Sequence, residues 1–116
     1  MEPVRGNVLV VEDNEDVGGL CVMILTKAGH GVRWTQTREA ALLSLNNYIY
    51  DVLIVDHSMP GMSLDDFLKK AQVGNVRKIV LMSAIVDLSI EAARLGLVHI
   101  LKKPFDPKSL ISIVQA

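Results

Sequence analysis

The sequence predicts an α/β fold in which five strand–helix units, (βα)5, form a doubly wound parallel sheet with helices on both faces. Short apolar, β-branched runs alternate along the chain with stretches that repeat apolar residues at helical spacing. Three of these runs are apolar throughout, which is typical of strands that are buried on both faces. A strand–helix–strand order implies parallel pairing through right-handed crossovers.

The predicted strands are short, and polar or helical stretches separate them. They cover residues 8–11, 31–35, 52–55, 79–82 and 99–101. The intervening helices carry start signals, because Ser, Thr and Asp side chains accept hydrogen bonds from the free N–H groups of a first turn. Asp16, Thr37 and Ser63 are therefore predicted to cap the first three helices. The fourth helix, short and alanine-rich, is predicted to end at Gly96, and the last to begin near Pro107.

Composition narrows the functional classes. The chain has 116 residues, half of them hydrophobic and 22% charged, which excludes disorder and fits one domain over residues 1–116. That domain is either complete or the N-terminal part of a longer protein.

The net charge of −1 and the lack of a basic stripe argue against direct nucleic-acid binding. One cysteine, Cys21, excludes a disulfide framework, and the apolar runs are too short to cross a membrane, so we expect a cytoplasmic protein.

Polar residues follow the predicted strands where each strand ends. Glu12 and Asp13 follow the first strand, Asp56 the third, Ser83 the fourth and Lys103 the fifth. Because ligands bind beyond the carboxyl ends of parallel strands, these side chains are expected to share one crevice. Clustered carboxylates repel one another unless a cation lies among them, and hard oxygen ligands suit Mg²⁺. The lysine and the hydroxyl opposite them suggest that an anion such as a phosphoryl group binds there.

Four segments carry a resemblance to a known family. They are VLVVED at 8–13, LIVDHSMPGM at 53–62, VLMSA at 80–84 and LKKPF at 101–105. In this order they resemble the receiver domain of two-component response regulators over nearly the whole chain. The resemblance implies a flavodoxin-like fold with strand order 2-1-3-4-5. It also implies phosphorelay signalling, in which a phosphoryl group switches the surface that controls an output partner.

The resemblance implies a role for each site residue. Asp56 matches the phosphoacceptor, which attacks a phosphohistidine of a sensor kinase and becomes an acyl phosphate. Ser83 and Lys103 match the residues that bind the phosphoryl group, and the bond between Lys103 and Pro104 is expected to be cis.

The resemblance also implies a Mg²⁺ site. Asp13 is expected to bind the ion directly, Glu12 largely through water, and Ser58 through its backbone carbonyl. Asp56 is expected to be a further ligand.

The expected partners are a sensor histidine kinase or a phosphotransfer protein. An output domain or a second copy of the chain would bind through the fourth helix, the fifth strand and the last helix. The family often has an aromatic residue where this chain has Ile100, and the spacing from Ser83 to Lys103 is about two residues shorter than is common. We therefore expect signalling through displacement of a loop and the fourth helix rather than through a ring rotation.

Other functions remain open from the residues alone. A Mg²⁺-dependent phosphohydrolase with an aspartate nucleophile would carry a second Asp two residues later, where this chain has Ser58. A degenerate receiver that acts only in protein contacts would lack a site residue, and none is missing. A flavin-binding protein would have a Ser/Thr/Gly-rich loop after the first strand, where this chain is acidic. His57, beside Asp56, is expected to point away from the site.

Overall fold

The computed structural model describes residues 6–71 and 76–116. The strands are β1 (Asn7–Val11), β2 (Gly31–Thr35), β3 (Val52–Asp56), β4 (Lys78–Ser83) and β5 (His99–Lys102). The helices are α1 (Glu15–Lys27), α2 (Arg38–Asn47), α3 (Leu64–Ala71), α4 (Leu88–Arg94) and α5 (Pro107–Gln115). Strands and helices alternate along the chain, as the sequence predicts.

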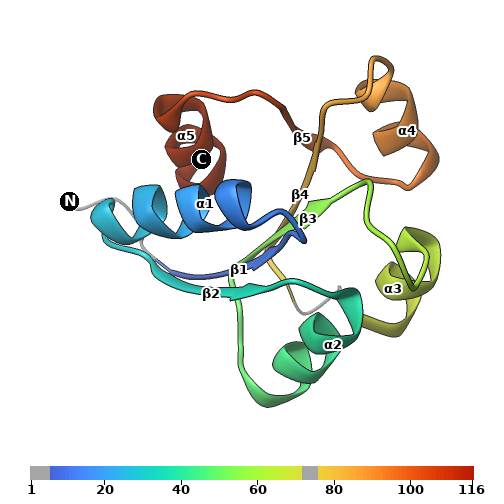
Figure 1. The fold of residues 1–116 in the computed structure, drawn as a ribbon, viewed down its shortest axis with the longest axis horizontal. Helices are drawn as coiled ribbons and strands as arrows, with labels where there is room; N and C mark the ends of the chain where they lie inside the picture. Colours follow the sequence, from blue (N-terminus) through green and yellow to red (C-terminus); the bar gives the residue numbers. More distant parts are fainter. Residues whose placement is uncertain (1–5, 72–75) are drawn as a thin grey trace.

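The five strands form one parallel sheet in the order β2-β1-β3-β4-β5. Helices α1 and α5 cover one face, and α2 and α3 cover the other (Figure 1). Helix α4 joins the second face, because its buried Leu88 and Ala92 share a core with Leu81 of the sheet. The predicted fold class and strand order are therefore confirmed.

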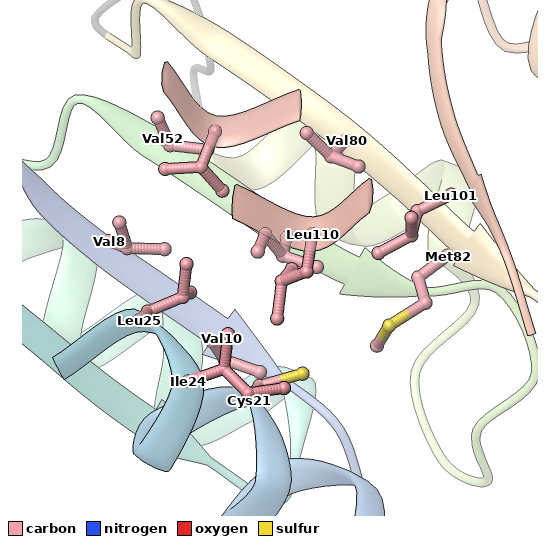
Figure 2. Packing of buried hydrophobic residues seen from close by; sticks show 12 residues of the cluster. Val8, Val10, Cys21, Ile24, Leu25, Val52, Val80, Met82, Leu101 and Leu110 are labelled. Atoms are coloured by element: carbon pink, nitrogen blue, oxygen red, sulfur yellow. The ribbon is translucent and has the colours of Figure 1, made fainter. Parts of the chain in front are cut away.

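Alternate residues of the central strands supply two separate cores. Val8 and Val10 of β1 face α1 and α5, where they pack with Cys21 and Leu110 (Figure 2). Leu9 lies in the core of the opposite face. All five residues of β3 are buried, as expected for a strand covered on both sides. Burial, together with the charge of Glu12, raises the pKa of the Cys21 thiol to about 12, so this side chain is a neutral part of the core.

The capping predictions hold for two helices and fail for one. Thr37 and Ser63 accept hydrogen bonds from the amides of Ala40 and Asp66, each at 3.1 Å. The predicted cap at Asp16 is wrong. Asn14 caps α1 by accepting from the amide of Val17 at 3.1 Å. The helix therefore starts two residues earlier than predicted, and Asp16 lies in its first turn, where a carboxylate also interacts favourably with the helix dipole.

The last third of the chain follows the sequence prediction closely. Helix α4 has seven residues and is the shortest helix in the described ranges. It is followed by Gly96 at a positive φ of 75°, a conformation that glycine adopts without strain. Asp106 caps α5, Pro107 is the first residue of that helix, and the bond between Lys103 and Pro104 is cis. Within residues 6–71 and 76–116, no helix is both long and apolar enough to span a bilayer.

Candidate functional site

The strand register brings the polar residues to one edge of the sheet. Val11 of β1 lies opposite Val55 of β3, so Glu12 and Asp56 come next on neighbouring strands. The backbone ladder continues past the last apolar residues. The amide of Lys103 donates to the carbonyl of Ser83 at 2.9 Å, which brings the fifth strand's lysine beside the end of the fourth.

Three carboxylates form an acidic cluster at this edge. Glu12, Asp13 and Asp56 each offer one oxygen, and these oxygens lie within 4.8 Å of one another. Glu12 is fully buried, Asp56 is 3% exposed, and Asp13 is open to solvent. Oxygen ligands around octahedral Mg²⁺ lie about 3–4 Å apart, so the cluster needs little closure to fit this ion. Its donors are all hard oxygens, which also suits Mg²⁺.

Lys103 connects two of these carboxylates. Its ammonium donates to Glu12 and, at 3.3 Å, to Oδ1 of Asp56. Burial by itself lowers the pKa of Lys103. The hydrogen bond to Glu12 and the charges of Asp56 and Glu12 outweigh burial and raise this pKa above its ordinary value. Lys103 is therefore a fixed cation that offsets part of the negative charge of the cluster.

Two expected site residues have other contacts in this state. Ser83 is 2% exposed, and its hydroxyl oxygen accepts from the amide of Ile85 at 3.2 Å. Ser58 is exposed on the loop after β3, and its hydroxyl lies 3.2 Å from Nδ1 of His57. Both residues sit at the same edge as the acidic cluster, one at the end of β4 and one just beyond β3.

His57 takes part in a separate polar network. Its Nε2 lies 3.1 Å from Glu91 of α4, which agrees with the expectation that this ring points away from Asp56. Arg94 of α4 donates to Glu91, and its guanidinium also pairs with Asp65 of α3 at 3.0 Å. Hydrogen bonds from Arg94 and His57 lower the pKa of Glu91 to about 2. This α4 network links α4 to α3 and to the loop that follows the phosphoacceptor candidate.

Arg38, the first residue of α2, is a site residue that no sequence motif indicated. The side chain is 2% exposed and lies beneath the loop between β3 and α3. Its guanidinium donates to the backbone carbonyls of Asp56 at 2.9 Å, His57 at 3.0 Å and Met62 at 2.6 Å. Burial lowers the pKa of Arg38, and the charges of Asp56, Glu39 and Asp13 partly oppose this shift. In the sequence, an arginine followed by a glutamate at the start of a helix gives no indication that the arginine side chain is buried.

Trp34 of β2 also contacts the site, through the backbone of Glu12. Its indole N–H donates to the backbone carbonyl of Glu12 at 2.8 Å. The ring lies against Gly18 of α1, where a β-carbon would come within 2.1 Å of an indole carbon. The glycine therefore creates the space that lets Trp34 reach Glu12.

This geometry agrees with the comparisons with known proteins. The family model described as "Response regulator receiver domain" matches residues 8–115. The chain therefore belongs to the receiver domain family of two-component response regulators.

Individual relatives share about a quarter to a third of their aligned residues with this chain. Transcriptional regulatory protein FixJ of Bradyrhizobium diazoefficiens is 28% identical over 97% of this chain and 56% of its own length. Response regulator protein FleR of Pseudomonas aeruginosa is 32% identical over 96% of this chain and 24% of its own length. The chain thus spans about half of one relative and a quarter of the other. The solved structure of chemotaxis protein CheY4 of Vibrio cholerae matches with a TM-score of 0.84 at 25% identity, covering 97% of this chain and 98% of that one.

Membership of this family defines the class of activity. A receiver domain is a phosphoacceptor switch in signal transduction rather than a typical enzyme. Receiver domains bind Mg²⁺ at an acidic pocket, and this chain has a cluster of three carboxylates. Response regulators work with histidine kinases and output domains. Neither a phosphohydrolase nor a contact-only receiver gains specific support from these findings.

Proposed function

We propose that this chain accepts a phosphoryl group on Asp56 from a sensor histidine kinase or a phosphotransfer protein in the cytoplasm. One observation carries the proposal. The carboxylate of Asp56 is almost fully buried at the end of β3, lies within the acidic cluster and is hydrogen-bonded to Lys103. It therefore combines a nucleophilic oxygen, a nearby cation and a group of possible metal ligands.

In the proposed reaction, a carboxylate oxygen of Asp56 attacks the phosphorus of a phosphohistidine. The P–N bond breaks, its electron pair stays on the imidazole nitrogen, and an acyl phosphate forms on Asp56. Lys103 would donate to one phosphoryl oxygen, and the Ser83 hydroxyl would donate to another. These charge-assisted hydrogen bonds would stabilise the charge that the transfer brings to the site.

Carboxylates of Glu12, Asp13 and Asp56, with the backbone carbonyl of Ser58, would hold the Mg²⁺ ion. When bound, the ion supplies positive charge that offsets repulsion between these carboxylates and an incoming phosphoryl group. Glu12 already accepts from Lys103 and from the amide of Asn14, at 3.2 Å for the latter. We therefore assign Glu12 to contact through water and Asp13, which is exposed, to direct coordination.

Hydrolysis of the acyl phosphate is expected to be slow. A phosphohydrolase of this chemistry uses a second carboxylate, two residues beyond the nucleophile, as its acid or base. That position is Ser58, whose hydroxyl is hydrogen-bonded to Nδ1 of His57. We therefore propose a lifetime of minutes or longer for the phosphorylated form, which suits a switch better than a turnover enzyme.

The signal is proposed to leave through α4, β5 and α5. Binding of a phosphoryl group would draw the Ser83 hydroxyl from the amide of Ile85 and move the loop that leads into α4. Ile100 of β5 is a β-branched residue with restricted χ1, so this chain lacks a rotating ring there. An output domain or a second copy of the chain would bind the altered face.

The test uses intact-mass measurement after incubation with Mg²⁺ and acetyl phosphate. We expect the wild-type chain to gain one phosphoryl group and Asp56→Asn to gain none, because the amide keeps the shape but lacks the attacking oxygen anion. Asp66→Asn is the matched control, since Asp66 is exposed on α3 and should not alter labelling. Full labelling of Asp56→Asn would assign the phosphoacceptor to another residue.

A further inference from the structure

The guanidinium of Arg38 binds the phosphoacceptor candidate, Asp56, through its backbone carbonyl. Its two terminal nitrogens donate to three backbone carbonyls, those of Asp56, His57 and Met62. The first two carbonyls lie where the chain leaves β3, and the third lies just before α3. One side chain therefore holds both ends of the loop 57–62.

Glu39, the residue after Arg38, also holds the end of this loop. The carboxylate of Glu39 accepts from the amide of Met62 at 3.3 Å, so Arg38 and Glu39 bind the carbonyl and the amide of the same residue. Gly61, directly before Met62, has a positive φ of 89°. The return of the loop toward α3 is thus fixed by a turn and by two side chains of α2.

Burying the charged guanidinium of Arg38 costs desolvation free energy. The hydrogen bonds that offset this cost therefore indicate what the residue does. The Arg38 side chain is 2% exposed, and its Nε has no hydrogen-bond partner among the residues that the structure describes. A buried guanidinium with an unpaired Nε is a poor choice for packing alone, because an apolar side chain of similar size avoids the desolvation penalty. The compensation lies in the three carbonyls, all of which belong to the segment that begins with Asp56.

We propose that Arg38 is a positioning residue for phosphoryl transfer, holding the loop after β3 so that the Asp56 carboxylate and the Ser58 backbone carbonyl face the acidic cluster together. This inference rests on the proposed function. Arg38 acts through the backbone, whereas Lys103 acts on the carboxylate itself. Loss of its bonds would let the nucleophile and a metal ligand shift relative to Glu12 and Asp13, and a displacement of about 1 Å can slow a reaction about a hundredfold.

The test compares Arg38→Met, which keeps the length but removes the donors, with Arg38→Lys, which keeps the charge. Initial phosphorylation rates are measured by intact mass over a range of acetyl phosphate concentrations at saturating Mg²⁺. We expect Arg38→Met to lower the maximal rate about tenfold to a hundredfold, with a smaller change in the half-saturating donor concentration. Arg38→Lys should recover part of the maximal rate, because an ammonium can still donate to one or two of the carbonyls.

Arg33→Met is the matched control. Arg33 is an exposed arginine of β2 whose guanidinium lies over the Tyr48 ring, 3.6 Å from the ring centroid. The phosphorylation rate of Arg33→Met should therefore equal that of the wild type. If Arg38→Met does not fold, the test instead compares amide hydrogen exchange in Arg38→Lys with that in the wild type. Exchange should then accelerate in residues 57–62 and stay unchanged in β1.

The possible outcomes distinguish the proposed function from the proposed role of Arg38. Failure of the wild-type chain to label on Asp56 would overturn the proposed function. Normal wild-type labelling together with a wild-type maximal rate in Arg38→Met would leave the function intact and overturn the role of Arg38. The same conclusion would follow if Arg38→Lys left both the rate and the loop exchange unchanged.

Discussion

Two neighbouring glycines of α1 differ in what a side chain would meet. A β-carbon on Gly18 would lie 2.1 Å from an indole carbon of Trp34, whereas nothing lies within 4 Å of one on Gly19. Gly18→Ala should therefore displace Trp34 and lower the free energy of unfolding by about 1–3 kcal/mol, as overpacking does. Gly19→Ala should raise it by about 0.5–1 kcal/mol, because alanine favours the helix.

Thermal and urea unfolding of the two variants check this prediction. The pair is internally controlled, since both substitutions add the same methyl group to the same turn of one helix. Equal stabilisation by both would mean that Trp34 does not occupy the space beside Gly18.

The limits of sequence reasoning at this scale are illustrated by caps and buried charges. Asp16 and Asn14 are both good capping residues, and only the path of the chain out of β1 decides between them. The burial of Arg38 could not be predicted from the sequence, because the residue pair Arg38–Glu39 is also typical of a solvent-exposed helix start. Its burial depends on the loop returning over α2, which is a tertiary event that local patterns do not encode.

At the scale of elements, the α4 network provides a prediction about pH. Glu91 accepts from Arg94 and lies beside His57, and these contacts hold its pKa near 2 against an ordinary value of 4.5. A depressed carboxyl pKa stabilises the fold above the unfolded-state pKa and loses this contribution as the pH falls. Glu91→Gln should therefore lower the unfolding temperature above pH 5, and the difference from wild type should disappear between about pH 4.5 and 2.

The control is Asp87→Asn, an acidic residue at the start of the same helix whose side chain makes no capping hydrogen bond. Its unfolding temperature should follow the wild type throughout this pH range. High salt should reduce the effect of Glu91→Gln, because salt screens ion pairs that solvent can reach, and the side chain of Arg94 is 51% exposed. A difference that persists unchanged at pH 2 would contradict the assignment to Glu91 ionisation.

Strand and helix positions were largely predictable from apolar periodicity, but their ends were not. Three of the strands were predicted to end at their last apolar residue, Val55, Met82 and Leu101. In the structure β3 continues to Asp56, β4 to Ser83 and β5 to Lys102, because ladder hydrogen bonds do not depend on side-chain polarity. Two of these extra residues, Asp56 and Ser83, carry the candidate chemistry.

At the scale of the whole molecule, Mg²⁺ should act as a stabilising ligand. An ion that binds only the folded chain raises the free energy of unfolding by about 1 kcal/mol at five times its dissociation constant. Asp13→Asn should reduce this gain by weakening binding, while leaving the ion-free stability equal or higher, because one of three clustered negative charges is removed. Thermal unfolding with and without Mg²⁺ measures both quantities.

Asp16→Asn is the matched control for that experiment. Asp16 is an exposed carboxylate in the first turn of α1, outside the cluster formed by Glu12, Asp13 and Asp56. Its Mg²⁺-dependent gain should equal that of the wild type. An undiminished gain in Asp13→Asn would locate the ion elsewhere.

The convergence of the candidate site was predictable because topology dictates it. Parallel strands carry their carboxyl ends to one edge, so Glu12, Asp56 and Lys103 had to meet once the order of strands was known. The α4 network was not predictable, since His57 and Glu91 are 34 positions apart and meet only when α4 packs beside the loop. Sequence motifs therefore identify the residues at the centre of the site better than those that support it.

Trp34 gives the molecule an intrinsic optical reporter. It is the single tryptophan of the chain, and its indole N–H is bonded to the carbonyl of Glu12, directly beside the acidic cluster. Indole fluorescence responds to hydrogen bonding and to nearby charge. Events that reorganise the carboxylates should therefore change the emission of the unlabelled protein, whereas a partner bound at α4 should leave the emission close to that of the free chain.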